Sequence, residues 1–119
     1  MRVRVGSVRV VAAHLGLSSR ERRYQVGIIR RHLDTLNESA AIVLGDFNEW
    51  RQAGPATRVL CPPFVAAAAG ASFPAWYPVL ALDRIWCRAP LRPAAGGPVD
   101  AFRHLSDHLP VFADLLFDA

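Results

Sequence analysis

The feature that most constrains this chain is an apolar run that stops at a glycine, after which a carboxylate and a carboxamide follow two residues apart (IVLGDFNEW, residues 42–50). Residues 41–44 are uncharged and partly β-branched, which predicts a strand buried on both faces. Because Gly45 frees the backbone at the end of this strand, Asp46 and Asn48 are expected at the carboxyl edge of a sheet, where α/β folds usually bind ligands. Extended geometry would turn both side chains the same way and Phe47 into the core. An ordinary turn is the alternative, since Gly, Asp and Asn are common turn residues.

Composition limits the class of protein. The chain has 119 residues and is 52% hydrophobic, so it is long enough for a single domain, residues 1–119, with its own core. No apolar run approaches the roughly 20 residues that span a bilayer, and no leader-like apolar segment follows the first four residues. We therefore expect a cytoplasmic protein. Cys61 and Cys87 lack metal-ligand spacing, and we expect free thiols rather than a disulfide.

The formal net charge is +4, and all fourteen basic residues are arginines. Because alanine, glycine and proline are also abundant, the absence of lysine indicates a GC-rich coding bias before it indicates phosphate recognition. Arginine does suit bidentate contacts to phosphate, although composition is weak evidence for them. A mildly basic surface favours an anionic substrate.

Three segments have clear periodic patterns. Alternating apolar and polar residues predict a hairpin at residues 3–10, whose second strand continues to Ala13. Ser18 and Glu21 have the spacing of a capping box, which predicts a helix that ends near Asn37. A strand follows at residues 41–44. This order favours an α/β fold with a helix-covered sheet.

The second half of the chain is less regular. Gly-Pro at 54–55 and Pro-Pro at 62–63 are expected to break any helix, and residues 64–71 to form an alanine-rich turn or short helix. Strands are expected at residues 79–87 and 109–116, with a surface loop of prolines and glycines at 88–99. The aromatic and proline-rich segment 72–78 is expected to pack as a loop, with a pocket wall as the alternative.

Polar residues recur at or near the ends of four predicted elements: His14, Asp46 with Asn48, Asp83, and Asp107 with His108. Hydrolysis of a phosphodiester by water needs a hard cation, a base or orienting carboxylate, and donors for the developing negative charge. Asp and Asn oxygens suit Mg²⁺ or Mn²⁺, and histidines suit proton transfer near neutral pH. A carboxylate inside a strand needs a partner, and His108 is the predicted partner of Asp83. Zinc is less favoured, because no cysteine joins the set and no HExxH spacing occurs.

Four segments of the sequence then resemble the successive motifs of the endonuclease/exonuclease/phosphatase superfamily, which includes deoxyribonuclease I: HLGL at 14–17, GDFNEW at 45–50, LDRI at 82–85 and SDHLPV at 106–111. The residues of GDFNEW and LDRI together are most similar to the motifs of the small bacterial metal-dependent hydrolases of this group. The resemblance implies that a phosphodiester in a nucleic acid, a phospholipid head group or a small ester is hydrolysed by direct water attack with Mg²⁺ or Mn²⁺.

The resemblance also implies roles for the matching residues. Asp46 would orient or deprotonate the attacking water, and Asn48 would stabilise the transition state. His108, positioned by Asp83, would contact the phosphate as base or donor, and His14 would be the second histidine. Asp107, with Asp46 and Asn48, would lie at the metal. The choice between Asp46 and His108 as the general base stays open.

One departure from the family pattern is large. Family members are usually about twice this long, and their amino-terminal half supplies an asparagine and a metal-binding glutamate. No glutamate here replaces the latter, since Glu21 belongs to the cap and Glu49 is expected to face away from the site. The resemblance therefore implies the carboxyl-terminal half of a deoxyribonuclease I-like αβ sandwich of four layers. Such a half would leave an apolar sheet face uncovered, which predicts a homodimer through that face or a truncated gene product. A non-catalytic half-domain that binds a partner chain or nucleic acid is the alternative function.

Overall fold

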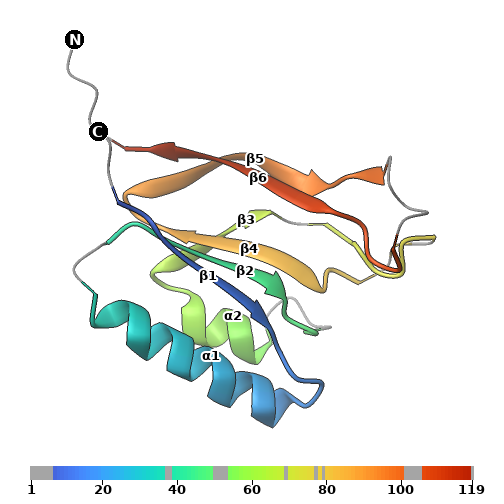
Figure 1. The fold of residues 1–119 in the computed structure, drawn as a ribbon, viewed down its shortest axis with the longest axis horizontal. Helices are drawn as coiled ribbons and strands as arrows, with labels where there is room; N and C mark the ends of the chain where they lie inside the picture. Colours follow the sequence, from blue (N-terminus) through green and yellow to red (C-terminus); the bar gives the residue numbers. More distant parts are fainter. Residues whose placement is uncertain are drawn as a thin grey trace.

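A four-stranded mixed sheet lies at the centre of the fold, in the strand order β1-β2-β4-β3 (Figure 1). The computed structural model describes residues 7–36, 39–49, 54–68, 70–76, 78, 80–100 and 106–118. The strands are β1 (Arg9–His14), β2 (Ala41–Asp46), β3 (Phe64–Ala68) and β4 (Asp83–Arg88). β1 and β2 are parallel, whereas β4 runs antiparallel to both β2 and β3.

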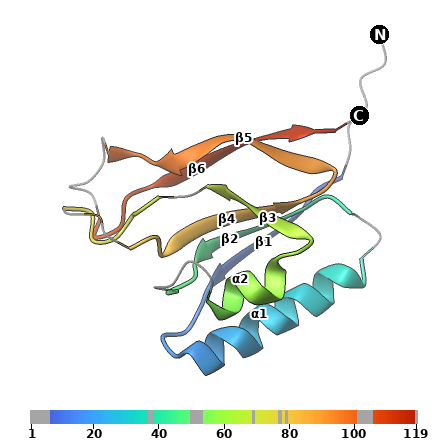
Figure 2. The same cartoon turned by 180° about the vertical axis from the view of Figure 1, so that it is seen from behind.

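Both helices, α1 (Ser19–Asp34) and α2 (Pro55–Leu60), cover one face of this sheet (Figures 1 and 2). The predicted cap of α1 is present, because Ser18 Oγ accepts a hydrogen bond from the Glu21 amide at 3.1 Å. The prediction that Gly-Pro at 54–55 breaks any helix is wrong. Pro55 instead begins α2, because the first turn of a helix needs no amide donor at that position.

An apolar core fills the space between the helices and the sheet. Its fully buried members are contributed by both helices, by β2 and β3, and by the turn after β2: Val26, Leu33, Val43, Phe47, Leu60 and Phe64 among them. The burial of Phe47 confirms that it points into the core. Because Phe47 is held in this way, the polar residues on either side of it are anchored to a packed structure rather than to a free loop.

A hairpin of β5 (Leu91–Pro98) and β6 (Val111–Phe117) covers the other face of the sheet, above β3 and β4 (Figure 2). A second, smaller core lies between the two layers and contains Ala67, Cys87 and Leu91. The sheet face that was expected to stay uncovered is therefore covered above β3 and β4. Apolar groups remain accessible elsewhere, since Val10 on β1 is 54% exposed and Phe117 on β6 is 52% exposed. Both cysteines are free thiols, as predicted.

Two predictions for the second half of the chain are wrong. Residues 64–68 form β3 rather than a turn or helix, because pairing with β4 and burial of Phe64 override the helix preference of alanine. Residues 91–98 form β5 rather than a loop. Within the described residues β5 pairs only with β6, so it is an edge strand that accommodates Pro93 and Pro98.

The remaining boundaries differ less. The strand expected at 79–87 begins at Asp83, and the terminal strand extends to Phe117. The first strand of the hairpin expected at 3–10 lies largely outside the described residues, and its second strand is β1. Among the described residues, no helix is long and apolar enough to cross a membrane.

Gly45 sets the geometry at the carboxyl edge of the sheet. Its φ is +137°, and a Cβ at this position would lie 1.8 Å from the carbonyl oxygen of Ala13. Only glycine therefore allows β1 and β2 to approach this closely at their ends. The pairing register then places His14 beside Asp46, and Asp46 beside Asp83 on β4.

Candidate active site

Three strands deliver one row of polar side chains to the same edge of the sheet. His14 ends β1, Asp46 ends β2 and Asp83 begins β4, and each is the direct cross-strand neighbour of the next. Directly paired residues project to the same face of a sheet, so these three side chains share a surface. The row results from the sequence pattern, in which each apolar run is bounded by a polar residue at this end.

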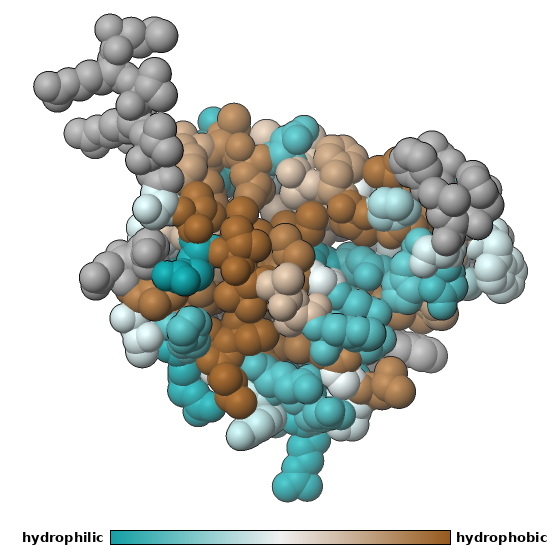
Figure 3. Space-filling model, in the orientation of Figure 1, coloured by the Kyte–Doolittle hydropathy of each residue, from teal (hydrophilic) through white to brown (hydrophobic). Residues whose placement is uncertain are grey.

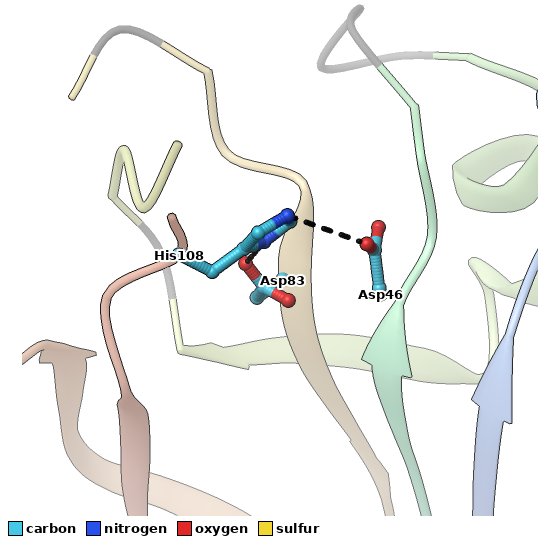
Figure 4. A group of neighbouring side chains, drawn as sticks. All are labelled: Asp46, Asp83 and His108. Atoms are coloured by element: carbon cyan, nitrogen blue, oxygen red, sulfur yellow. Dashed lines mark hydrogen bonds and ion pairs between the residues drawn. The ribbon is translucent and has the colours of Figure 1, made fainter. Parts of the chain in front are cut away.

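His108 reaches this row from the segment that precedes β6. Its Nδ1 lies 2.5 Å from Asp83 Oδ2, and its Nε2 lies 3.7 Å from Asp46 Oδ2 (Figure 4). The predicted partnership of Asp83 and His108 is therefore present. With Nδ1 occupied by Asp83, the opposite ring nitrogen is directed toward Asp46 and is the one available to a substrate.

The histidine ring is held in place by its surroundings. Phe73 packs against it with ring centroids 4.7 Å apart, and the Ser72 hydroxyl donates to Asp83 Oδ2 at 2.7 Å. The main chain beside these residues is also paired, since the Leu109 amide donates to the Ser72 carbonyl at 2.7 Å. The 72–75 segment therefore fixes both members of the His108–Asp83 pair.

Electrostatics favour the charged form of His108. Partial burial lowers its pKa, but the hydrogen bond to Asp83 and the nearby carboxylates of Asp83, Asp46 and Asp107 outweigh burial and raise the pKa above its ordinary value of 6.5. A proton on His108 is thus stabilised beside the carboxylates of Asp83 and Asp46.

Asn48 closes the turn that follows β2. Its φ is +47°, so the extended geometry expected for residues 46–48 does not persist. The Asn48 amide donates to Asp46 Oδ1 at 2.8 Å, and its side-chain Nδ2 donates to the Leu15 carbonyl at 2.6 Å. Asn48 thereby orients the Asp46 carboxylate and ties this turn to the segment after β1. The left-handed backbone is one that asparagine tolerates better than most residues.

The other predicted residues differ in how closely they join the cluster. His14 Nε2 lies 3.6 Å from Asp46 Oδ2, but the His14 side chain is 77% exposed. Asp107 is exposed, and its carboxylate accepts a hydrogen bond from the Ser106 hydroxyl. Asp107 lies outside the close cluster of Asp46, Asp83 and His108, and its charge contributes to the raised pKa of His108. Glu49 faces away from the site, as expected, and is buried.

The close cluster could hold a metal ion. One ligand atom from each of Asp46, Asp83 and His108 lies within 4.8 Å of the others. The two carboxylates supply the oxygen ligands that Mg²⁺ or Mn²⁺ prefers. A cavity of about 270 Å³ adjoins the two carboxylates, with apolar walls from Leu44, Ile85 and Leu109.

Two contributors to the site were not predicted. Ser72 and Phe73 lie in the aromatic and proline-rich segment whose function was left between packing and pocket wall. The only sequence signal was that a carboxylate inside a strand, such as Asp83, needs hydrogen-bond donors, and this signal does not say which serine supplies one. Residue spacing alone does not show that segment 72–75 pairs with 107–109.

Comparisons with known proteins identify the family and the fold of the chain. Residues 2–108 match the model of the endonuclease/exonuclease/phosphatase family. The uncharacterized protein YbhP of Escherichia coli K12 is 33% identical over 117 residues, which are 92% of this chain and 46% of YbhP. The chain therefore spans about half the length of the curated relatives that it matches.

Solved structures show the same fold. An endonuclease/exonuclease/phosphatase family protein from Bacteroides thetaiotaomicron superposes with a TM-score of 0.77 at 16% identity, covering 92% of this chain and 50% of that one. The mannosyl-6-phosphatase Bt3783 from Bacteroides thetaiotaomicron VPI-5482 gives 0.71 at 16% identity, with 91% and 51% covered. These matches confirm the expected half of a deoxyribonuclease I-like sandwich. On the family match and the relative together, the chain belongs to the endonuclease/exonuclease/phosphatase family.

Proposed function

We propose that this chain carries the histidine- and aspartate-bearing half of a phosphoester-hydrolysing site, with a phosphodiester as its substrate. The observation that carries the proposal is the convergence of Asp46, Asp83 and His108 from three separate segments, with His108 Nδ1 bound to Asp83 (Figure 4). Family membership supports a hydrolase, and a phosphatase is among the proteins with this fold.

The residues divide the chemistry as follows. Asp83 holds the ring of His108 and stabilises its proton, so that Nε2 can donate to a phosphate oxygen as negative charge develops. Asp46, whose carboxylate is oriented by the Asn48 amide, can position a water molecule or accept its proton. His14 lies on the open side of Asp46, where it can contact the leaving group.

A divalent cation fits the same residues. Asp46 and Asp83 would hold it, with Asn48 and Asp107 as further oxygen donors of the site. A bound Mg²⁺ or Mn²⁺ supplies positive charge against the phosphate oxygens. The substrate itself could be a nucleic acid, a phospholipid head group or a small ester, since the named residues contact only the shared phosphate group.

The direct test is hydrolysis of bis(4-nitrophenyl) phosphate by the purified chain with Mg²⁺, with Mn²⁺ or with chelator. Turnover that depends on metal and is lost in both Asp46→Ala and His108→Ala supports the proposal. Hydrolysis of 4-nitrophenyl phosphate, a monoester, is compared with that of the diester to test whether a diester is the preferred substrate. Turnover that is the same in the two variants as in the wild type contradicts the assigned site.

A binding role is the second candidate, and exposed apolar side chains favour it. Figure 3 shows a band of apolar residues on the face where β6 and β1 lie. Val10, Phe112, Leu116 and Phe117 on these strands are 44–54% exposed, and within the described residues each strand pairs with one neighbour only. We propose a second copy of the chain as the occupant, because two open strand edges and an apolar band are a surface that can pair with its own counterpart.

The molar mass from light scattering tests this role. A dimer that Val10→Asp converts into a monomer supports it, whereas a wild-type monomer at all concentrations contradicts it. If the dimer forms and the diester is not hydrolysed, the chain is a binding half-domain. If both are observed, the second copy accompanies an active site.

A further inference from the structure

Both site-bearing segments continue directly into a buried ion pair. Glu49 follows Asn48, and Arg84 follows Asp83. Arg84 Nη1 lies 3.2 Å from Glu49 Oε2, and the two side chains are 10% and 1% exposed. Charges withdrawn from water this far are costly unless each polar atom has a partner.

The Glu49 carboxylate has hydrogen-bond partners besides Arg84. Glu49 Oε1 accepts from the Ala56 amide at 2.7 Å, and Oε2 accepts from the Thr57 amide at 3.4 Å. The carboxylate also packs against Gly54, where a Cβ would lie 2.4–2.6 Å from Glu49 atoms. The start of α2 is thus shaped around this one carboxylate.

Arg84 bonds the main chain of both segments as well. Its Nη2 donates to the Glu49 carbonyl at 2.9 Å, one residue beyond Asn48, and its Nε donates to the Ala81 carbonyl at 2.8 Å, two residues before Asp83. The Phe47 amide donates to the Leu82 carbonyl at 2.8 Å between these two bonds. A planar guanidinium with several fixed donors is suited to hold two backbones at one separation.

We propose that the Glu49–Arg84 pair sets the separation of the Asp46–Asn48 turn from Asp83, so that both are positioning residues for the site. This inference rests on the proposed function for its catalytic consequence, but the positioning itself is a property of the chain. Apolar side chains of similar volume would hold α2 against the sheet without the desolvation cost of two charges. The ion pair in addition fixes the relative position of the two site segments, because Arg84 donates hydrogen bonds to the main chain of both.

The test uses two conservative variants, Arg84→Lys and Glu49→Gln, with Arg88→Lys as the matched control. Arg88 lies at the other end of β4, its side chain is 11% exposed, and it also pairs with an acidic residue. Exchange of individual amide protons with solvent is followed by NMR at Phe47 and Asn48, which lie in the turn, and at Val43 in the middle of β2. Hydrolysis of bis(4-nitrophenyl) phosphate is measured on the same samples.

We expect at least tenfold faster exchange at Phe47 and Asn48 in both variants, a clearly smaller acceleration at Val43 that reflects the loss of overall stability, and wild-type exchange in Arg88→Lys. We also expect kcat to fall at least tenfold with KM changed less than threefold. Unchanged exchange at the turn overturns the inference. Equal acceleration at Val43 also overturns it, because the pair would then only stabilise the whole sheet. Absence of turnover in the wild type contradicts the proposed function alone, since the exchange measurement decides the positioning.

Discussion

The two ends of β4 carry the same side chain in two different settings. Arg84 and Arg88 are 10% and 11% exposed, and each lies over an aromatic ring, Trp86 at 5.9 Å and Phe64 at 5.2 Å. Each is paired with a carboxylate. The difference is in the acid, because the Glu49 side chain is 1% exposed and that of Asp34 is 49% exposed.

This difference decides what each ion pair contributes. Water can solvate Asp34 when its arginine is removed, so that pair is worth about 0–1 kcal/mol. Glu49 has no such access to water, and removal of its partner leaves a charge in the interior. The site end of β4 is therefore the end at which one substitution affects both stability and geometry.

The largest effect is expected for Arg84→Met. Loss of the guanidinium leaves Glu49 buried and unpaired, and the free energy of unfolding should fall by roughly 3–5 kcal/mol. Urea denaturation measures the change. The double variant Arg84→Met with Glu49→Leu should recover most of the stability. A single variant within 1 kcal/mol of the wild type would remove the contrast between the two ends.

Asp83→Asn sharpens the comparison within the site end, because it changes the chemistry of the residue next to Arg84 with little change in volume. The carboxylate that stabilises the His108 proton is lost, and diester hydrolysis should fall by about 10²–10⁴-fold, the range of general acid–base catalysis. Initial rates at saturating metal measure this. Asp114→Asn, on the exposed side of β6, is the control and should keep the wild-type rate.

Substitution of Val10 on β1 should have a smaller effect, measured as a change in self-association. The substitution Val10→Leu changes hydrophobicity little, whereas Val10→Asp places a charge in the apolar band. Val10→Asp should weaken self-association at least tenfold, and Val10→Leu should leave it unchanged. Sedimentation velocity over a concentration series gives both values. Equal effects of the two substitutions would show that β1 lies outside the contact.

The pH dependence of stability tests the site end of β4, where His108 contacts Asp83. His108 has a raised pKa in the folded chain, so its contribution is fully present below its unfolded value, about 6.5, and is lost as pH rises through the raised value. In chelator, the stability difference between wild type and His108→Gln should therefore shrink as the pH rises above about 6.5. Thermal unfolding across this pH range measures it, and a difference that grows with pH would have the wrong sign.

The smallest effect is expected for Asp34→Asn, the counterpart of Glu49→Gln. Asp34 pairs with Arg88 and also with Arg30 at 3.2 Å, but it is half exposed, and the loss should stay below about 1 kcal/mol. Urea denaturation at low and high salt provides the check. A loss that equals that of Glu49→Gln would mean that burial of the acid does not distinguish the two ends.

The sequence predicted the residues at the strand ends better than the elements around them. His14, Asp46, Asp83 and His108 were found because each interrupts or bounds an apolar run, and the structure brings them together. β3 and β5 were missed because alanine, proline and glycine have weak or opposite strand preferences, and pairing with β4 or β6 overrides them.

Partners distant in sequence were the other gap. The sequence indicated that Asp83 needs a partner and that Glu49 faces away from the site. It did not indicate that Arg84, 35 residues after Glu49, is the group that Glu49 meets. Local periodicity reports which face a residue occupies, whereas the pairing of two buried charges depends on how separate elements pack.

The tight contact at Gly45 has a consequence for the interpretation of mutational screens. In a saturation library selected only for folded protein, position 45 should retain glycine alone, since any side chain would meet the Ala13 carbonyl. Intolerance there is then a fingerprint of backbone shape and says nothing about chemistry. Its neighbour Asp46 should tolerate substitution under the same selection and lose that tolerance only when turnover is selected. Comparing, at each position, the tolerance to substitution in the two selections therefore identifies the reacting groups.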